Sequence, residues 1–274
     1  DYGISIKLKE VVLPDGIKYI GDFAFYGCSK LENINVTDSV VHIGGSAFYN
    51  TKFEEEFPDG DVYLGKTYYT YKGEMPAETN IVLKDGTTCI SAKAFYGYDE
   101  LIGIEMPDSI EHIEYSAFRG CINLKNIKMS QNTNYIGDFS FAYCDSLISI
   151  TISGKDTYIG EDAFRECDNL KNVEIENGIR TIGRGAFYRC LKLVNMKIPN
   201  TVIDIASMAF YNCPISNITV PESVMYMGDS VFGVWRSYQT INIQFKEGEI
   251  PPGWNSRWNY GCFATITYLG SQPV

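Results

Sequence analysis

The chain has 274 residues, of which 45% are hydrophobic and 14% aromatic, so it has enough apolar surface for a large core and too much for a disordered chain. Its net charge of -11 argues against a nucleic-acid groove, because phosphate binding needs clustered Lys and Arg. No apolar stretch approaches the ~20 residues that a transmembrane helix needs. We therefore expect neither nucleic acid as a partner nor membrane insertion of this segment.

The N-terminal segment begins within a pattern, Leu8-x-x-Val11-x-Leu13-Pro14, and no charged-then-apolar leader precedes it. We therefore expect a fragment of a longer protein whose signal and anchor lie outside this segment.

A phenylalanine recurs along the chain, and internal repeats decide the fold before any other feature. From Phe95 to Phe210 every interval is 23 residues, whereas the step from Phe48 to Phe95 is 47 and the last step is 22. One irregular turn therefore lies between Phe48 and Phe95. The recurring positions are Phe25, Phe48, Phe95, Phe118, Phe141, Phe164, Phe187, Phe210 and Phe232.

Each unit contains two kinds of apolar spacing. The segment L-x-x-I-x-I, as in Leu170-x-x-Val173-x-Ile175, alternates apolar and polar residues and predicts a short, half-buried strand. The segment I-G-x-x-A-F-x-x-C, as in Ile182 to Cys190, predicts a second extended piece, a bend at glycine and a helical or 3-10 turn.

One unit cannot bury its apolar side alone, but stacked units can. Ile, Val, Ala, Phe and Cys would then form interior columns along the axis. About eleven turns at the ~4.8 Å spacing of paired strands predict a rod of roughly 50 Å. Strand crossovers of this kind are expected to be right-handed.

The repeated I-G-x-x-A-F-x-x-C-x-x-L-x-x-I-x-I-P unit resembles the BspA-like leucine-rich repeats, found in surface proteins of gut and oral bacteria and of some parasitic protists. The resemblance covers essentially residues 7–245. It implies an α/β repeat: a right-handed leucine-rich-repeat solenoid with short strands, short helical or 3-10 turns and a 23-residue period. It also implies a cell-surface or secreted protein, with adhesion to host matrix or other cells in some members.

Residues 51–80 break the period. The β-forming residues around Gly65-Lys66 predict a hairpin. We favour an insertion tolerated at the edge of the solenoid. The alternative is a ligand-contacting arm, because tyrosine is common at interfaces. The tyrosines of this segment are Tyr63, Tyr68, Tyr69 and Tyr71.

Residues 246–274 also abandon the repeat. An open solenoid end exposes core and strand edges, so we expect a solenoid domain of residues 1–245 followed by a cap of residues 246–274. Trp254 and Trp258 lie in this cap, and a sugar-stacking platform is the alternative interpretation.

Histidines and cysteines are the main candidates for chemistry. His42 and His112 occupy one phase of the repeat, three turns apart, which predicts a separation of roughly 14 Å and excludes shared metal ligation. Six cysteines lie three residues after a repeat Phe, an inward phase that predicts buried free thiols: Cys28, Cys121, Cys144, Cys167, Cys190 and Cys213.

No phosphate-binding loop, nucleophile elbow or C-x-x-C pair occurs. We therefore expect no catalytic residue, no cofactor-binding residue, no metal site and no cofactor.

A partner surface is predicted from the strand pattern instead. The residues that flank the first Ile of L-x-x-I-x-I point outward, and stacking places them in rows on one face. A solvated sheet surface explains these residue types as well as a binding surface does. The candidate partner-binding residues, hereafter the polar ladder, are Asn35, Glu105, Asn126, Lys128, Ser149, Thr151, Asn172, Glu174, Asn195 and Lys197.

A second candidate surface is the position after the repeat Phe, which holds Arg119, Arg165 and several tyrosines. We rank it below the polar ladder.

These patterns favour an extracellular recognition or adhesion module that binds a protein or glycan, such as host matrix or a neighbouring cell surface, and is not an enzyme. The first alternative is a structural spacer that displays another domain of a longer surface protein. An enzyme is the remote alternative.

Overall fold

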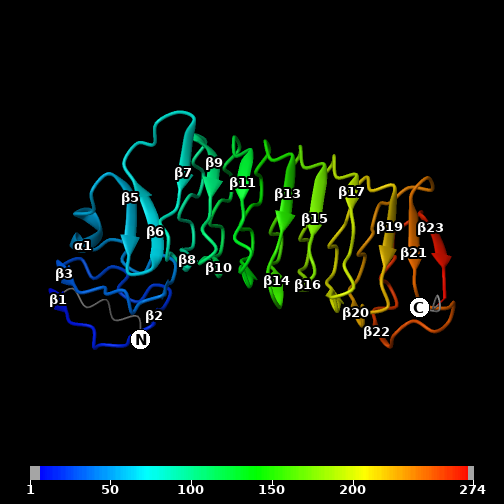
Figure 1. The fold of residues 1–274 in the computed structure, drawn as a ribbon, viewed down its shortest axis with the longest axis horizontal. Coiled ribbons are helices and arrows are strands. Elements are labelled where there is room, and N and C mark those ends of the chain that lie inside the picture. Colours follow the sequence, from blue (N-terminus) through cyan, green and yellow to red (C-terminus); the bar gives the residue numbers. More distant parts are fainter. Residues whose placement is uncertain (1–6, 271–274) are drawn as a thin grey trace.

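The computed structural model describes residues 7–270 and shows a solenoid of about eleven turns with little helix (Figure 1). The first six residues of the predicted solenoid and the last four of the predicted cap lie outside the described residues. Successive turns stack side by side along the long axis, as equivalent apolar residues at a fixed spacing require.

The first strand of each turn comes from the L-x-x-I-x-I segment, and these strands form what we call the first-strand face. They pair in parallel in four short sheets, ordered β1-β3, β7-β9-β11, β13-β15-β17 and β19-β21-β23. The strands are β1 (Glu10–Val11), β3 (Asn33–Ile34), β7 (Thr79–Val82), β9 (Leu101–Glu105), β11 (Asn126–Lys128), β13 (Ser149–Ile152), β15 (Asn172–Ile175), β17 (Asn195–Met196), β19 (Asn217–Val220), β21 (Thr240–Ile243) and β23 (Thr265–Tyr268).

The second strand of each turn carries the Ile of the Ile-Gly step. β2 and β4 pair with each other, and the remaining strands form one ten-stranded sheet that ends in β8-β6-β5. Its strands pair in parallel, β6 with β8 included, and the exception is β5, which pairs with β6 in the antiparallel direction. The strands are β2 (Tyr19–Ile20), β4 (His42–Ile43), β5 (Gly60–Leu64), β6 (Thr67–Lys72), β8 (Cys89–Ile90), β10 (His112–Ile113), β12 (Tyr135–Ile136), β14 (Thr157–Ile159), β16 (Ile179–Ile182), β18 (Asp204–Ile205), β20 (Tyr226–Met227) and β22 (Gly253–Trp254).

The segment after the second strand contains single tight turns where the sequence predicted helical or 3-10 turns. The amide of Cys144 donates to the carbonyl of Phe141, three residues earlier, at 3.3 Å. Phe139 and Tyr143 have φ of 56° and 62°, so left-handed residues stop the turn from continuing as a helix. Within residues 7–270 the one α-helix is α1 (Lys52–Glu55).

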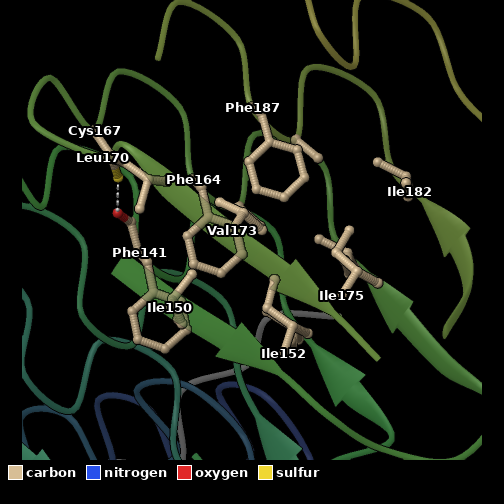
Figure 2. Packing of buried hydrophobic residues seen from close by; sticks show 14 of the residues in the cluster. Phe141, Ile150, Ile152, Phe164, Cys167, Leu170, Val173, Ile175, Ile182 and Phe187 are labelled. Atoms are coloured by element: carbon tan, nitrogen blue, oxygen red, sulfur yellow. Dashed lines mark hydrogen bonds between the residues drawn. The ribbon is translucent and has the colours of Figure 1, made fainter. Parts of the chain in front are cut away.

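The repeat phenylalanines form a stacked column in the core (Figure 2). The ring centroids of Phe118 and Phe141 lie 5.0 Å apart, those of Phe141 and Phe164 5.2 Å, and those of Phe164 and Phe187 5.3 Å, with nearly parallel planes. All four side chains are fully buried. The predicted interior column is therefore confirmed.

A second column consists of the cysteines three residues after each Phe. The Cys167 thiol donates to the carbonyl of Phe141 at 3.1 Å, and the Cys190 thiol donates to the carbonyl of Phe164 at 3.0 Å. The cysteines in the described part of the chain are free thiols, as predicted. Trp235 replaces the cysteine in the last regular turn, and its indole N–H donates to the carbonyl of Phe210 at 2.8 Å. The column therefore supplies one donor to each preceding turn as well as apolar bulk.

The glycine of the Ile-Gly step fits against the backbone of the preceding turn. A Cβ at Gly160 would lie 2.5 Å from the carbonyl carbon of Gly137, and a Cβ at Gly183 would lie 2.5 Å from the carbonyl oxygen of Ile159. Glycine is needed here because the stacked turns leave no room for a side chain.

Residues 60–72 form an antiparallel hairpin, β5 and β6, that turns at Gly65 and Lys66. Tyr68 is fully buried and stacks on Phe95 with ring centroids 4.6 Å apart, so it continues the phenylalanine column. The hairpin is thus part of the sheet and core. Its outer strand, β5, is the edge strand of the ten-stranded sheet, which agrees with an insertion at the edge. Tyr68 and Tyr69 are buried and cannot contact a ligand, whereas Tyr63 and Tyr71 are partly exposed, so ligand contact through these two stays a prediction.

The C-terminal tryptophans are buried, with exposures of 6% for Trp254 and 5% for Trp258. The Trp254 indole N–H donates to the carbonyl of Val224 at 3.0 Å, and Trp258 packs edge-on against Phe232. The sugar-stacking platform is therefore wrong, because neither indole face is open to a ligand. A separate cap of residues 246–274 stays a prediction.

Candidate functional site

The polar ladder lies on the first-strand face. Its ten side chains are exposed, because each flanks a buried apolar residue of its strand. Nine of them, from Glu105 to Lys197, lie in or directly after β9, β11, β13, β15 and β17. These five strands are neighbours along the solenoid (Figure 1). Asn35 is separate: it follows β3, on the other side of the hairpin, and its amide bonds to both backbone groups of Leu13.

Neighbouring ladder residues also bond to one another. The Asn195 side-chain amide donates to Asn172 at 2.6 Å, and Lys128 lies 3.7 Å from the Glu105 carboxylate. Both charged side chains of this ion pair are more than half exposed, so the pair adds little stability. Glu174 and Lys197 carry further charge on the same face. Part of the ladder is therefore satisfied within the sheet, and its charges are available to solvent.

Shallow depressions follow this face. One is lined by residues of β7, β9 and β11, including Glu105 and Lys128; a second lies over β11, β13 and β15; and a third lies over β15, β17 and β19, including Glu174 and Lys197. All three are open and lined by polar and apolar atoms together. They suit an extended partner better than a small enclosed ligand.

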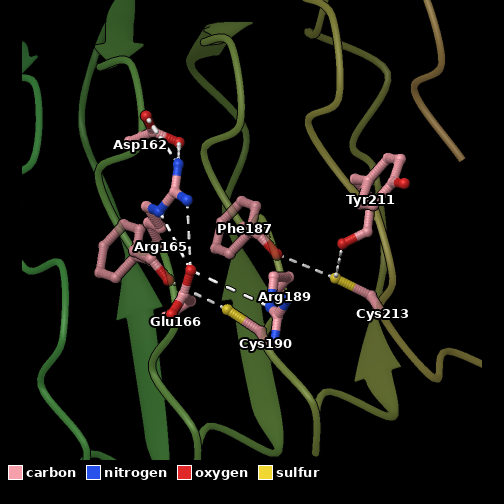
Figure 3. A network of polar contacts seen from close by, with 9 residues as sticks. Asp162, Arg165, Glu166, Phe187, Arg189, Cys190, Tyr211 and Cys213 are labelled. Atoms are coloured by element: carbon pink, nitrogen blue, oxygen red, sulfur yellow. Dashed lines mark hydrogen bonds and ion pairs between the residues drawn. The ribbon is translucent and has the colours of Figure 1, made fainter. Parts of the chain in front are cut away.

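The second candidate surface, after the repeat Phe, is occupied by contacts within the solenoid (Figure 3). Arg165 lies 3.5 Å from Asp162 and 3.2 Å from Glu166, and its guanidinium lies 4.5 Å from the centre of the Tyr188 ring. These contacts cover the corner between turns and leave Arg165 less free to bind a partner.

His42 and His112 lie much closer than the spacing of strands predicted. Their ring centroids are 6.0 Å apart, so the expected separation of roughly 14 Å is wrong for the side chains. The hairpin is the reason: β6 leaves the regular path, and the turns on either side meet directly. Ser91 donates to the carbonyl of Ile43 at 2.9 Å, and Thr88 donates to the carbonyl of Val41 at 2.8 Å.

Glu114 joins the two histidines. One of its carboxylate oxygens lies 3.3 Å from Nδ1 of His42 and 3.8 Å from Nδ1 of His112. Burial raises the pKa of Glu114 to about 7, with a smaller contribution in the same direction from Asp22. Burial lowers the pKa of His42, with a smaller contribution from His112, and burial also lowers the pKa of His112 itself.

Cys89 completes this cluster. Its sulfur lies 3.6 Å from Nδ1 of His42, and its side chain is fully buried between the histidines. Sequence reasoning missed Cys89 and Glu114. Cys89 stands at a phase where most other turns have tyrosine or histidine, although Thr181 and Asp204 also occur there. Glu114 stands where most turns have the tightly packed glycine.

Comparison with known protein families agrees with the solenoid fold. A family model described as the BspA type leucine-rich repeat region, in 6 copies, matches residues 2–71, 67–190 and 157–253. The chain belongs to the BspA-type leucine-rich-repeat family. No curated protein matches it.

Solved structures of several bacterial proteins match most of the chain. A leucine-rich repeat protein from Eubacterium ventriosum is 18% identical, with 82% of each chain covered and a TM-score of 0.53. The pneumococcal vaccine antigen PcpA is 15% identical, with 98% of this chain and 69% of its own covered and a TM-score of 0.50. A leucine-rich cell surface protein from Faecalibacterium prausnitzii is 20% identical over 98% of this chain and 75% of its own, with a TM-score of 0.37.

None of the helices in the described part of this BspA-type chain has the length and apolar character to cross a membrane.

Proposed function

We propose that this BspA-type chain is a cell-surface or secreted recognition module, without catalytic activity, that binds a protein or glycan through its first-strand face. The observation that carries the proposal is the continuity of the polar ladder. Nine exposed polar side chains cross five consecutive strands, and open depressions follow the same path. Extended, open faces of this kind are where solenoid proteins hold large ligands.

The charges of the ladder favour a partner with mixed charge. Negative and positive side chains alternate along the face, in the order Glu105, Lys128, Glu174 and Lys197, so neither sign of charge dominates. A polyanion such as nucleic acid would meet carboxylates at regular intervals, and the chain as a whole carries a net charge of -11. A protein surface or a glycan with few charges fits this pattern better.

A binding panel tests the proposal. The chain is immobilised and exposed to extracellular matrix proteins and to a glycan array, and the hits are repeated with Lys128→Glu and Glu174→Lys. We expect each charge reversal to weaken binding about tenfold or more, because like charges would then face each other across the interface.

Matched controls lie on the ten-stranded sheet. Glu111→Lys and Arg180→Glu change the same charges on exposed side chains away from the polar ladder. If the controls weaken binding as much as the ladder variants, the first-strand face is not the binding surface. A chain that binds none of the panel would favour the spacer function.

A further inference from the structure

The cluster around Cys89 has the composition of a transition-metal site. His42, Cys89 and Glu114 each offer one ligand atom, and these three atoms lie within 4.8 Å of one another. Imidazole nitrogen, thiolate sulfur and carboxylate oxygen are the three ligand types that zinc prefers, whereas calcium and magnesium prefer oxygen alone.

Two of the three distances between ligand atoms match those around a tetrahedral ion. With Zn–N and Zn–O near 2.1 Å and Zn–S near 2.3 Å, tetrahedral angles place nitrogen and oxygen about 3.4 Å apart and nitrogen and sulfur about 3.6 Å apart. In the structure the His42 nitrogen lies 3.3 Å from the Glu114 oxygen and 3.6 Å from the Cys89 sulfur. These side chains therefore lie in positions that an ion could occupy with small adjustments.

His112 lies beside the cluster, but it is not among the three groups whose ligand atoms lie within 4.8 Å of one another. Its Nδ1 is 3.8 Å from the same Glu114 oxygen, a few tenths of an ångström longer than the tetrahedral distance. Its side chain is 37% exposed and that of His42 is 23% exposed, so the cluster opens to solvent and an ion can enter.

Thr67 provides independent support. Its hydroxyl is fully buried and, within residues 7–270, has no hydrogen-bond partner. Thr67 is the register partner of Cys89 in the pairing of β6 with β8. A metal-bound thiolate would accept a hydrogen bond from this hydroxyl, and such outer contacts orient the ligands of metal sites.

Glu114 is the residue whose presence most needs an explanation. Gly137, at the same phase in the next turn, has no room for a Cβ, which would lie 2.7 Å from the carbonyl carbon of Glu114. A glutamate at a glycine phase is directed into a partly buried site beside two histidines. Its ionised carboxylate is costly to bury, and a bound cation would offset that cost.

We propose that one zinc ion binds at the joint between the hairpin and the regular turns, held by three side chains, His42, Cys89 and Glu114, with His112 next to the site. His42 comes from the strand before the hairpin, and the other two ligands come from turns after it. The hydrophobic core is divided at the same place, into one cluster from Ile20 to Tyr69 and another from Tyr68 onward. The ion would therefore clamp the N-terminal turns to the rest of the solenoid.

Metal titration of the whole chain tests the site. After removal of metals with a chelator, we expect the chain to bind one equivalent of Zn²⁺ and to unfold at a higher temperature when zinc is present. Co²⁺ in the same site should show the charge-transfer absorption of a thiolate ligand. We expect Glu114→Gly, which restores the residue of other turns, and His42→Tyr, which places the tyrosine of other turns, to weaken zinc binding roughly 100-fold or more.

Matched controls separate the site from adventitious binding. Glu111→Gln removes a neighbouring exposed carboxylate, and Cys167→Ser removes a thiol of the regular column; both should bind zinc as the unmodified chain does. Thr67→Val should weaken binding by about 10- to 100-fold without removing a ligand. The proposal is overturned if the unmodified chain binds no zinc, if Co²⁺ shows no thiolate absorption, or if Glu114→Gly and His42→Tyr bind as tightly as the controls.

Discussion

The turns from residue 90 to residue 245 and the segment from residue 7 to residue 89 follow the same repeat with different strictness. In the later turns the same residue types return to most phases: Phe in the column, usually Cys three residues after it (Tyr98 and Trp235 are the exceptions) and usually Gly at the tight step. In the earlier segment Thr51 takes the cysteine position and Tyr68 replaces a phenylalanine ring. Strict periodicity stabilises the stack, because residues at one phase of the repeat pack against residues of the same type in the adjacent turns.

This difference between the two regions indicates where a solenoid can hold a cluster of reactive polar side chains. Where a side chain packs between the turns on both sides, few residue types fit at that phase of the repeat. Where the hairpin interrupts the stack, that constraint is relaxed, and the neighbouring phases hold His42, Cys89 and Glu114. The regular region presents an extended surface, and the interrupted region presents a compact polar cluster.

The largest expected effect concerns the phenylalanine column. Phe164→Ala should lower the free energy of unfolding by about 3–5 kcal/mol, because it leaves a cavity between two stacked rings in a fully buried column. Phe25→Ala should cost less than about 2 kcal/mol, since Phe25 is half-buried and, within residues 7–270, stacks on Phe48 alone. Urea unfolding followed by circular dichroism measures both. Equal losses would mean that the two regions do not differ in packing.

A smaller effect is expected at the tight glycine step. Gly160→Ala should cost about 1–3 kcal/mol, because the new Cβ would meet the backbone of the preceding turn. Gly21→Ala, at the same phase in the first turn, should change stability by less than about 0.5 kcal/mol, since no atom of residues 7–270 lies within 4 Å of its Cβ position. Thermal unfolding of the two variants compares them. A neutral Gly160→Ala would show that the turns can separate without loss.

The regular part of the fold could be predicted because the same residue types recur at a fixed spacing in the sequence. The Phe spacing predicted one column, and Phe118, Phe141 and Phe164 lie in it. The alternation of apolar and polar residues placed the polar ladder on an exposed face, since side chains of a strand alternate between its two sides. Its use as a binding surface stays a prediction.

The interrupted part could not be predicted in the same way. The estimate for His42 and His112 multiplied the strand spacing by three, which holds only while every turn follows the regular path. The hairpin changes the path of the chain at this point. The distance between the side chains on its two sides then depends on local packing and not on their spacing in the sequence. Glu114 was the visible signal, because a charged residue at a glycine phase indicates a local change in the stack.

The cysteine column gives the smallest effect, and its dependence on pH is specific. Burial raises the pKa of Cys121, Cys167 and Cys213 to about 12, above the ordinary value near 9. Above pH 9 the unfolded chain therefore releases thiol protons that the folded chain retains. The stability that these thiols contribute is complete below pH 9 and is lost as the pH rises toward 12.

Cys167→Ala should reduce this alkaline loss by removing one such group, and should cost about 1 kcal/mol at neutral pH through the lost contact with the Phe141 carbonyl. Cys262→Ala is the matched control, because Cys262 is only partly buried and lies outside the column. Unfolding by urea at several pH values between 7 and 11 measures the slope. If Cys167→Ala and Cys262→Ala have the same slope as the unmodified chain, the column thiols do not control alkaline stability, and their regular recurrence reflects packing volume alone.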